Sequence, residues 1–493
     1  MPLKNRRTDT LIIGNGALAL FLAEELSRRG TTNDITVVGP SHRLGGASQA
    51  AGAMLGCFCE VTADTFRTDE GRSRFEIGVK SHELWNDTLE RLTDLSPSLK
   101  PLKVAEETHV ILNSVGSDFD STNFEAMVDA LNSYQRPWSD VDPAEITGFN
   151  PQPNSRAFRA IKLPNEGAID ARAVLETLET ALQRSGVSLI DQTVRRVLQK
   201  SGQVVGVELH SGEIIEAGVV VVAAGAKSED LINGIDDGFG IQPTFAGLGM
   251  GLVSRRIEGT PFKSVVRTPN RAFACGLHVV PGGDGTEYLG STNRLVPEIA
   301  TGACLEDLSY FTRSAMEQLD ENIEHHQVEK LLVGNRPVTL DGFPLIGALP
   351  VTGLFVMTGT YRDGFHCAPQ LAVQMADEIL GTPQEIHDQF RPDRRPIATK
   401  SVEESINEFA EQSVAMWYES GANAPFPTED LFNYRREQAE KQYEFLGIDY
   451  GLNPDVLWYT IRYPSGAPKI VNYFNSHKLR TPMQASMREA HVA

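Results

Sequence analysis

The sequence predicts an α/β protein of two or three domains, and three observations support this. Residues 10–13 form a short apolar run rich in β-branched side chains, which is typical of a buried parallel strand. A glycine-rich turn follows, and then a helical stretch over residues 20–29 that Gly30 ends. A second apolar run at residues 35–38 completes a strand–helix–strand unit. The length of 493 residues allows two or three domains of roughly 150 residues each.

The composition describes an acidic globular protein. Hydrophobic residues make up 41% of the chain and charged residues 22%, which is ordinary for a protein with a packed core. The formal net charge of -20 argues against a nucleic-acid partner, whose phosphates the surface would repel. No stretch approaches the roughly 18 apolar residues of a membrane span, so we expect a cytoplasmic protein. An anionic small substrate would need cationic side chains inside its site.

The five cysteines indicate neither a disulfide framework nor a metal site. No CxxC pair occurs, and no His/Cys group has the spacing of a zinc site. Cys57 and Cys59 are two residues apart, and we expect both to be small core residues rather than a local disulfide. No metal is therefore predicted.

The turn after the first strand has the spacing of a dinucleotide-binding loop. Gly14 allows a tight turn, and Gly16 lets the backbone approach a pyrophosphate at the helix N-terminus. Ala19 stands where a third small residue lets helix and strand pack closely. We therefore expect Gly14, Gly16, Ala17 and Ala19 at a cofactor. A glycine-rich turn with a purely structural role is the alternative.

The end of the second strand departs from the dinucleotide-binding pattern. An acid at this position normally binds the adenosine ribose, but here the strand runs into Gly39 and Pro40. Ribose binding would then be left to backbone groups or to Ser41, His42 or Arg43. Arg43 would also suit the 2′-phosphate of NADP, so the loop alone does not choose between NADP and FAD.

A dense run of small residues from 45 to 56 suits backbone that lies against a ligand. This run resembles the flavin-contacting segment of the D-amino-acid oxidase superfamily, and most closely glycine oxidase and sarcosine oxidase relatives. Three later segments resemble the same family in the same order, at residues 165–226, 334–347 and 359–369. The four segments together imply FAD as the cofactor.

The resemblance also implies which residues contact FAD. The last segment opens a helix whose N-terminus faces the isoalloxazine, where its positive end would stabilise the anionic reduced flavin. Sarcosine oxidase relatives attach flavin through a cysteine after the Arg-Pro pair, but residues 337–347 contain none, so we expect non-covalent binding; Cys367 keeps a covalent alternative open. Beyond the first turn, the residues expected at the cofactor are Arg43, Gly46, Ala47, Ser48, Ala51, Gly52, Met54, Val194, Ala224, Gly225, Arg336, Arg362, Asp363, Gly364, Phe365 and His366.

An amino-acid substrate needs a clamp for its carboxylate, and the planar fork of arginine suits it. The resemblance places Arg336 and Arg362 on the substrate side of the flavin, with His278 and Tyr361 as further substrate contacts. Arg336 is expected to hold the carboxylate; the alternatives are an ion pair with Asp341 or a surface arginine before proline. Each of the other three residues has a structural role as its alternative. Arg362 would brace the flavin loop through backbone carbonyls, His278 would be a structural histidine, and Tyr361 would pack in the core.

The resemblance implies oxidation of the C–N bond of an amine or amino acid to an imine, by hydride transfer to FAD with O2 as acceptor. The flavin would supply the chemistry, so no catalytic side chain is assigned. One alternative is a dehydrogenase on the same fold that passes electrons to a quinone or carrier. Another is a flavin-binding subunit of a larger assembly.

Three parts of the chain are expected. They are a Rossmann-like FAD-binding domain (8–100, 156–235 and 331–385), a substrate domain on a mixed or antiparallel sheet (101–155 and 236–330), and a mainly helical C-terminal extension (386–493).

The extension has no counterpart in the family resemblance. Ser401 and Glu404 form a capping-box pattern before a predicted helix at 401–420, and a second helix is predicted at 428–446. The extension either packs on the protein's own surface, contacts another subunit or partner, covers the active site, or docks a carrier-bound substrate.

Overall fold

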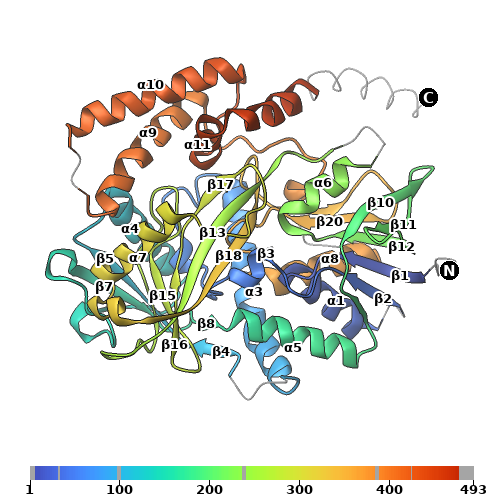
Figure 1. Cartoon of the computed structure of the whole chain (residues 1–493), viewed down its shortest axis with the longest axis horizontal. Helices are drawn as coiled ribbons and strands as arrows, with labels where there is room; N and C mark the ends of the chain where they lie inside the picture. Colours follow the sequence, from blue (N-terminus) through green and yellow to red (C-terminus); the bar gives the residue numbers. More distant parts are fainter. Residues whose placement is uncertain are drawn as a thin grey trace.

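The computed structural model describes residues 6–30, 34–96, 101–235, 240–382, 388–422 and 425–476. Two sheets form the body of the molecule, and a group of helices from the end of the chain lies at one end of it (Figure 1). The expectation of an α/β fold with a helical C-terminal region is confirmed. Residues 386–387, 423–424 and 477–493 of the expected extension lie outside the described residues.

The first sheet has eight strands, in the order β10-β11-β12-β1-β2-β9, with β19 and β20 attached through β12. Its centre is parallel: β1 lies between β12 and β2, and β20 and β9 continue the sheet on either side. The strands are β1 (Arg6–Ile13), β2 (Ile35–Val38), β9 (Ser188–Ile190), β10 (Val194–Lys200), β11 (Gln203–Leu209), β12 (Ile214–Val222), β19 (Leu345–Ala348) and β20 (Leu354–Thr358). This sheet contains the strand–helix–strand unit predicted from the first 38 residues.

Helices cover this sheet and complete its core. They are α1 (Ala17–Arg29), α3 (Asp69–Thr93), α5 (Ala171–Arg184) and α8 (Ala368–Leu380). Helix α1 is apolar on most sides, and Leu20, Leu22 and Leu26 are fully buried because α5 and α8 pack against it. Gly30 ends α1 in the left-handed conformation, as predicted.

The second sheet has ten strands and runs in the order β3-β18-β13-β16-β15-β14-β5-β7-β6, with β17 attached to β13. Its strands are β3 (Gly45–Gly46), β5 (Thr108–Asn113), β6 (Ser139–Val141), β7 (Ala157–Leu163), β13 (Thr244–Arg255), β14 (Val265–Arg267), β15 (His278–Pro281), β16 (Thr286–Gly290), β17 (Arg294–Val296) and β18 (Gln327–Thr339). Most pairs are antiparallel. Strands β7 and β18 belong to this sheet, although β7 and all but the first four residues of β18 fall in stretches expected to form the FAD-binding domain.

Shorter elements join the two sheets around the site. The short helix α2 (Ala47–Ala50) follows β3, and a 3-10 helix, η1 (Phe58–Glu60), holds Cys59. Cys57 and Cys59 are buried free thiols, as predicted. Strands β4 (Lys103–Ala105) and β8 (Ala168–Ile169) pair, and α4 (Asp118–Ser133), α6 (Ser228–Asn233) and α7 (Leu305–Gln318) complete the body.

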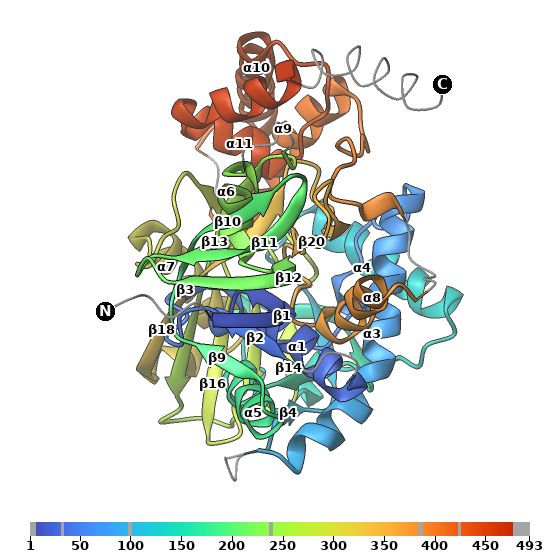
Figure 2. The ribbon, with the colours of Figure 1, turned by 90° about the vertical axis from the view of Figure 1, so that its right-hand side faces the viewer.

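The described part of the extension contains the helices α9 (Val402–Glu419), α10 (Thr428–Leu446) and α11 (Pro454–Arg462), and residues 467–476 are helical as well. The predicted capping box is present, because Ser401 accepts from the backbone N–H of Glu404 and Glu404 accepts from that of Ser401. The helices pack together over the ends of β13, β17 and β18 and lie at the top of both views (Figures 1 and 2). In the described part of the chain, no helix is both long and apolar enough to cross a membrane.

Candidate functional site

A cavity of about 490 Å³ lies where the two sheets meet. The carboxyl ends of β1, β2 and β12, the N-terminus of α1, helix α2 and strands β13, β15 and β18 line it. Ligands of parallel α/β sheets bind at the carboxyl ends of the strands, so this position is the expected one for a nucleotide.

Gly14 shapes the turn at one end of the cavity, here called the phosphate end. Its backbone has φ 130°, and a Cβ there would lie 2.2 Å from the carbonyl oxygen of Ala223 at the end of β12. The next helix begins at Gly16 without a capping side chain and without an acid in its first turn. Ser48 of α2 accepts the N–H of Ala17 at 3.0 Å. The crowded glycine and the mostly uncapped helix end fit a pyrophosphate, which backbone N–H groups would bind.

The missing ribose-binding acid has a steric explanation. A Cβ at Gly39 would lie 2.8 Å from atoms of Gly14 and Asn15, so no acidic side chain fits there. Ser41 is bound to Asp191 through its backbone N–H and its hydroxyl. Arg43 pairs with Glu179 at 2.5 Å and donates to the carbonyl of Asn15 at 2.6 Å. A 2′-phosphate would therefore meet an arginine that is already neutralised.

Every residue assigned to the cofactor or substrate lines this cavity, with one exception; of the three side chains considered for the ribose, Arg43 lines it, whereas Ser41 and His42 do not. Ala19 does not line it, because its side chain points into the core and is fully buried. Its place fits the predicted role of a small residue that lets helix and strand approach.

Arg336 lies at the other end of the cavity, here called the substrate end. Its guanidinium donates to the carbonyl of Thr292 (3.0 Å) and the hydroxyl of Ser291 (3.2 Å), and lies 3.4 Å from Oδ1 of Asn293. These are neutral oxygens, and no carboxylate among the described residues forms an ion pair with Arg336. The alternative of an ion pair with Asp341 is wrong, because Asp341 pairs instead with Arg394.

Gly249 makes room for this arginine. A Cβ at Gly249 would lie 2.2–2.5 Å from the guanidinium of Arg336. Gly247, Gly249 and Gly251 occupy alternate positions of β13 and so face the same side of the sheet. This pattern was not recognised from the sequence, although glycines at alternate positions of a strand signal a close approach.

His278 lines the cavity and has one ring nitrogen without a proton. Its Nδ1 donates to the carbonyl of Gly276 at 2.8 Å, which leaves Nε2 with its lone pair. Burial lowers the pKa of His278 to about 4, so the ring is neutral at pH 7. The ring stacks on Tyr288, whose hydroxyl donates to the carbonyl of Ala50. A neutral histidine of this kind can accept a hydrogen bond.

His366 and Cys367 lie at the start of α8. The Nε2 of His366 donates to the carbonyl of Gly78 at 2.9 Å, which ties this segment to α3. Burial raises the pKa of the Cys367 thiol, so the nucleophilic thiolate is disfavoured. This disfavours the covalent attachment that Cys367 had left open.

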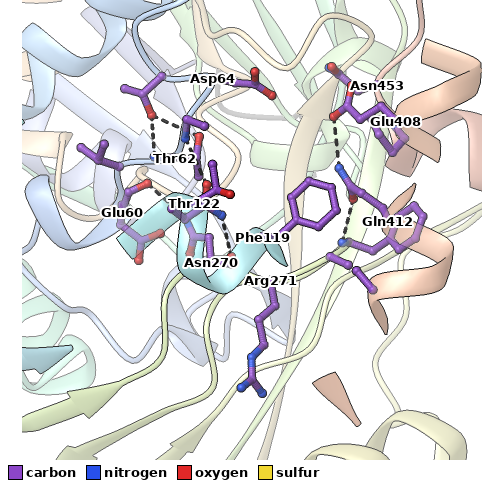
Figure 3. Close-up of a pocket in the computed structure, with 18 of the residues that line it drawn as sticks. Glu60, Thr62, Asp64, Phe119, Thr122, Asn270, Arg271, Glu408, Gln412 and Asn453 are labelled. Carbon is purple, nitrogen blue, oxygen red and sulfur yellow. Dashed lines mark hydrogen bonds between the residues drawn. The ribbon is translucent and has the colours of Figure 1, made fainter. Parts of the chain in front are cut away.

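A second cavity of about 1640 Å³ lies between the extension and the body, and is here called the groove. Figure 3 shows Glu60, Thr62 and Asp64 on one side, Glu408, Gln412 and Asn453 on the other, and Phe119 of α4 between them. Six residues line the groove and the first cavity alike, so the two cavities adjoin: Gly56, Glu60, Tyr361, Arg362, Asp363 and His366.

The extension contributes Asp455 to this junction. Asp455 is on the first turn of α11, and its carboxylate accepts a 2.6 Å hydrogen bond from the hydroxyl of Tyr361. Sequence reasoning missed Asp455, because a lone aspartate in the first turn of a helix is ordinary.

The parallel sheet, the glycine turn and the cavity define a dinucleotide-binding protein. Residues 9–378 match the family described as FAD dependent oxidoreductase. The chain belongs to this family, and its cofactor is FAD. The described part of the extension, from residue 388 on, lies outside the match.

The relatives fit this assignment. A bifunctional protein ThiO/ThiG from Trichormus variabilis is 27% identical over 375 residues, which is 76% of this chain but 52% of that protein. The chain therefore spans about half the length of this relative. Glycine oxidase from Bacillus licheniformis is 25% identical over 77% of this chain and 94% of that protein. The crystal structure of glycine oxidase from Geobacillus kaustophilus has the same fold, with a TM-score of 0.67 and 20% identity over 79% of this chain and 100% of that one.

Proposed function

We propose that the protein oxidises the C–N bond of an amino acid or related amine to an imine, with FAD as hydride acceptor and O2 as the final electron acceptor. The observation that carries this proposal is Arg336. Its guanidinium lines the cavity, is positioned by neutral oxygens and has no carboxylate partner in the described part of the chain. A cation of this kind suits the carboxylate of an amino acid.

The relatives support an amino-acid substrate. Glycine oxidase from Bacillus licheniformis, which the chain covers almost completely, is named for an amino acid. The bifunctional relative is only half covered, so its activity carries less weight.

The residues that line the first cavity are proposed to hold FAD without a covalent bond. The turn at Gly14 and Gly16 would take the pyrophosphate, and the loop before α8 would lie at the flavin ring. Bound FAD supplies the acceptor for the hydride that leaves the substrate carbon, while a proton leaves the nitrogen and the C–N bond becomes C=N. Denaturation that releases all of the yellow colour would confirm non-covalent binding.

Arg336 and His278 are proposed to orient the substrate. Arg336 binds the carboxylate, and Nε2 of His278 accepts a hydrogen bond from the substrate nitrogen. His278 remains neutral at pH 7 because burial lowers its pKa to about 4. Both groups hold the reacting carbon in place, which lowers the entropic part of the barrier.

The substitution Arg336→Ala tests this proposal. We expect KM for an amino-acid substrate to rise about 10- to 100-fold, because a hydrogen bond to a charged group contributes about 1.5–3 kcal/mol. Arg313→Ala removes an exposed arginine as a control and should leave KM unchanged. An unchanged KM in the Arg336 variant would contradict the proposal that Arg336 binds the substrate carboxylate.

An acceptor assay separates an oxidase from a dehydrogenase. The oxidase produces peroxide in air without an added acceptor, whereas a dehydrogenase requires a quinone or artificial dye. If no amino acid or amine bleaches the flavin anaerobically, the protein is instead a flavin-binding subunit. A small-molecule substrate and a cytoplasmic location remain part of the proposal, as does contact with a second subunit through the extension.

A further inference from the structure

The hydroxyl of Tyr361 is the meeting point of three side chains. It lies 2.6 Å from Oδ2 of Asp455, 2.6 Å from Nδ2 of Asn293 and 3.1 Å from Nη2 of Arg362. Tyr361 also holds a left-handed backbone conformation with φ 51°, which is strained for a tyrosine. Contacts on several sides are needed to keep a residue in that conformation.

The direction of each hydrogen bond follows from the groups involved. Arg362 and the amide nitrogen of Asn293 can only donate, so they occupy the two lone pairs of the tyrosine oxygen. The hydroxyl proton must then point to Asp455, which accepts it. The Tyr361 hydroxyl is fully used, and it has no hydrogen left for a substrate.

The same network reaches the substrate clamp. Asn293 donates from Nδ2 to Tyr361 and to the carbonyl of Phe273, so its Oδ1 faces Arg336 at 3.4 Å. A carboxylate from the extension is thus connected to both arginines of the substrate end. The extension contributes this carboxylate from beyond the segment that matches the family, residues 9–378.

Arg362 is held within this network rather than in an ion pair. It donates to the carbonyl of Ala274 at 3.1 Å, and its guanidinium lies 4.7 Å from the centre of the Tyr361 ring. Its Nε is buried and has no hydrogen-bond partner among the described residues. Asp455 is the acid that faces Arg362 through Tyr361. A charged Asp455 offsets one of the two arginine charges and leaves one for the substrate; burial raises the pKa of its carboxyl, and the charges of Arg362 and Arg336 oppose that rise.

We propose that Asp455 is a specificity-determining residue that limits the substrate end to one carboxylate, so the enzyme accepts monocarboxylic amino acids and discriminates against dicarboxylic ones. This inference rests on the proposed function, because it takes Arg336 as the carboxylate clamp. Asp455 acts through Tyr361 and does not itself bind the substrate carboxylate.

The acidic side chains of the groove also disfavour a second carboxylate on the substrate. Glu408 and Glu411 on α9 and Asp64 on the opposite wall line the groove that adjoins the substrate end. Eleven acidic and five basic side chains line the groove, so a second carboxylate that points from the substrate end into it meets a wall with more acids than cations.

The test measures the binding of two inert carboxylates to the FAD-loaded protein. The change in flavin absorbance reports the binding. Acetate carries one carboxylate and malonate two. In the natural protein we expect malonate to bind no more tightly than acetate. In Asp455→Asn, which keeps the side-chain shape, the ratio of the malonate Kd to the acetate Kd should fall about 10-fold, because one negative charge is removed from a partly buried site.

Two further variants complete the test. Asp449→Asn removes an exposed acid of the extension and should leave the ratio unchanged. Asp455→Glu keeps the charge and should restore the ratio of the natural protein to within about 3-fold. An unchanged ratio in Asp455→Asn, or tighter malonate binding in the natural protein, would overturn the role of Asp455 alone. If neither carboxylate perturbs the flavin in any form, the carboxylate site itself is absent, and the proposed function fails with it.

Discussion

The phosphate end and the substrate end of the cavity differ in the parts of the chain that build them. The phosphate end consists mainly of backbone, with the turn at Gly14 and Gly16, the end of β12 and the start of α2. The substrate end consists of side chains from β15, β18, the loop before α8 and the extension. Backbone can bind a pyrophosphate that is common to all dinucleotides, whereas side chains can adapt the other end to one substrate. The phosphate end therefore holds the part of the site that dinucleotide-binding proteins share, and the substrate end holds the side chains that this chain adds.

The largest expected effect is at the phosphate end. Gly14→Ala places a Cβ 2.2 Å from the carbonyl oxygen of Ala223 and forces alanine into a conformation with φ 130°. Such strain costs about 1–3 kcal/mol before the overlap is counted. We expect the variant to be purified without FAD, as measured by absorbance at the flavin band relative to protein. Gly218→Ala, where no atom lies within 4 Å of the new Cβ, should keep its FAD. Full FAD content in the Gly14 variant would contradict this view of the phosphate end.

A smaller effect is expected from loosening the extension. Phe409 of α9 is fully buried, and its ring contacts Phe273 and Trp458. Phe409→Ala should destabilise the docked extension by about 3–5 kcal/mol. We expect faster limited proteolysis of the extension and a higher KM, because Tyr361 loses its contact with Asp455, while FAD is retained. Phe445→Ala, at an exposed position, is the control. If the variant lost FAD as well as the docked extension, the phosphate end would depend on the extension, and the comparison of the two ends of the cavity would fail.

The smallest expected effect concerns pH. Glu419 at the end of α9 accepts from Ser117 at 2.6 Å and from the backbone of Ala272 at 3.1 Å. Burial, with Asp120 nearby, raises its pKa from 4.5 to about 7. The folded protein therefore holds this proton more tightly than the unfolded chain, and the contribution of Glu419 to stability falls as pH rises from about 4.5 to about 7.

The substitution Glu419→Gln should flatten this part of the pH dependence. The change in Tm between pH 5 and pH 8 should shrink by a few degrees at most, as thermal unfolding of the FAD-loaded protein would measure. An identical pH dependence in the two proteins would show that Glu419 does not titrate in this range.

The parts of the fold that could be predicted from the sequence are those that depend on local residue patterns. The strand, turn and first helix follow from neighbouring residues, because β-branched runs, glycine turns and helix ends act over a few positions. The capping box at Ser401 and Glu404 was found in the same way. The dinucleotide-binding unit and the helices of the extension were therefore within reach of the sequence, and the FAD family followed from the resemblance of four segments.

Contacts between distant segments could not be predicted in this way. The partner of Asp341 is Arg394 rather than Arg336, and Arg43 is held by Glu179 of α5. The acid missing after β2 had no explanation until the crowding at Gly39 was visible. Each of these depends on which strands and helices lie side by side.

The sequence by itself determined the dinucleotide-binding class, because dinucleotide binding uses glycines and helix ends that are close together in the chain. The prediction of FAD came from the resemblance of four segments to a known family. Only the tertiary structure decided that the extension reaches the substrate end. Asp455 follows Tyr361 by 94 positions, and nothing local connects the two. Their contact depends on α11 packing over β13, β17 and β18, and buried apolar surface that is spread over the whole chain determines that packing.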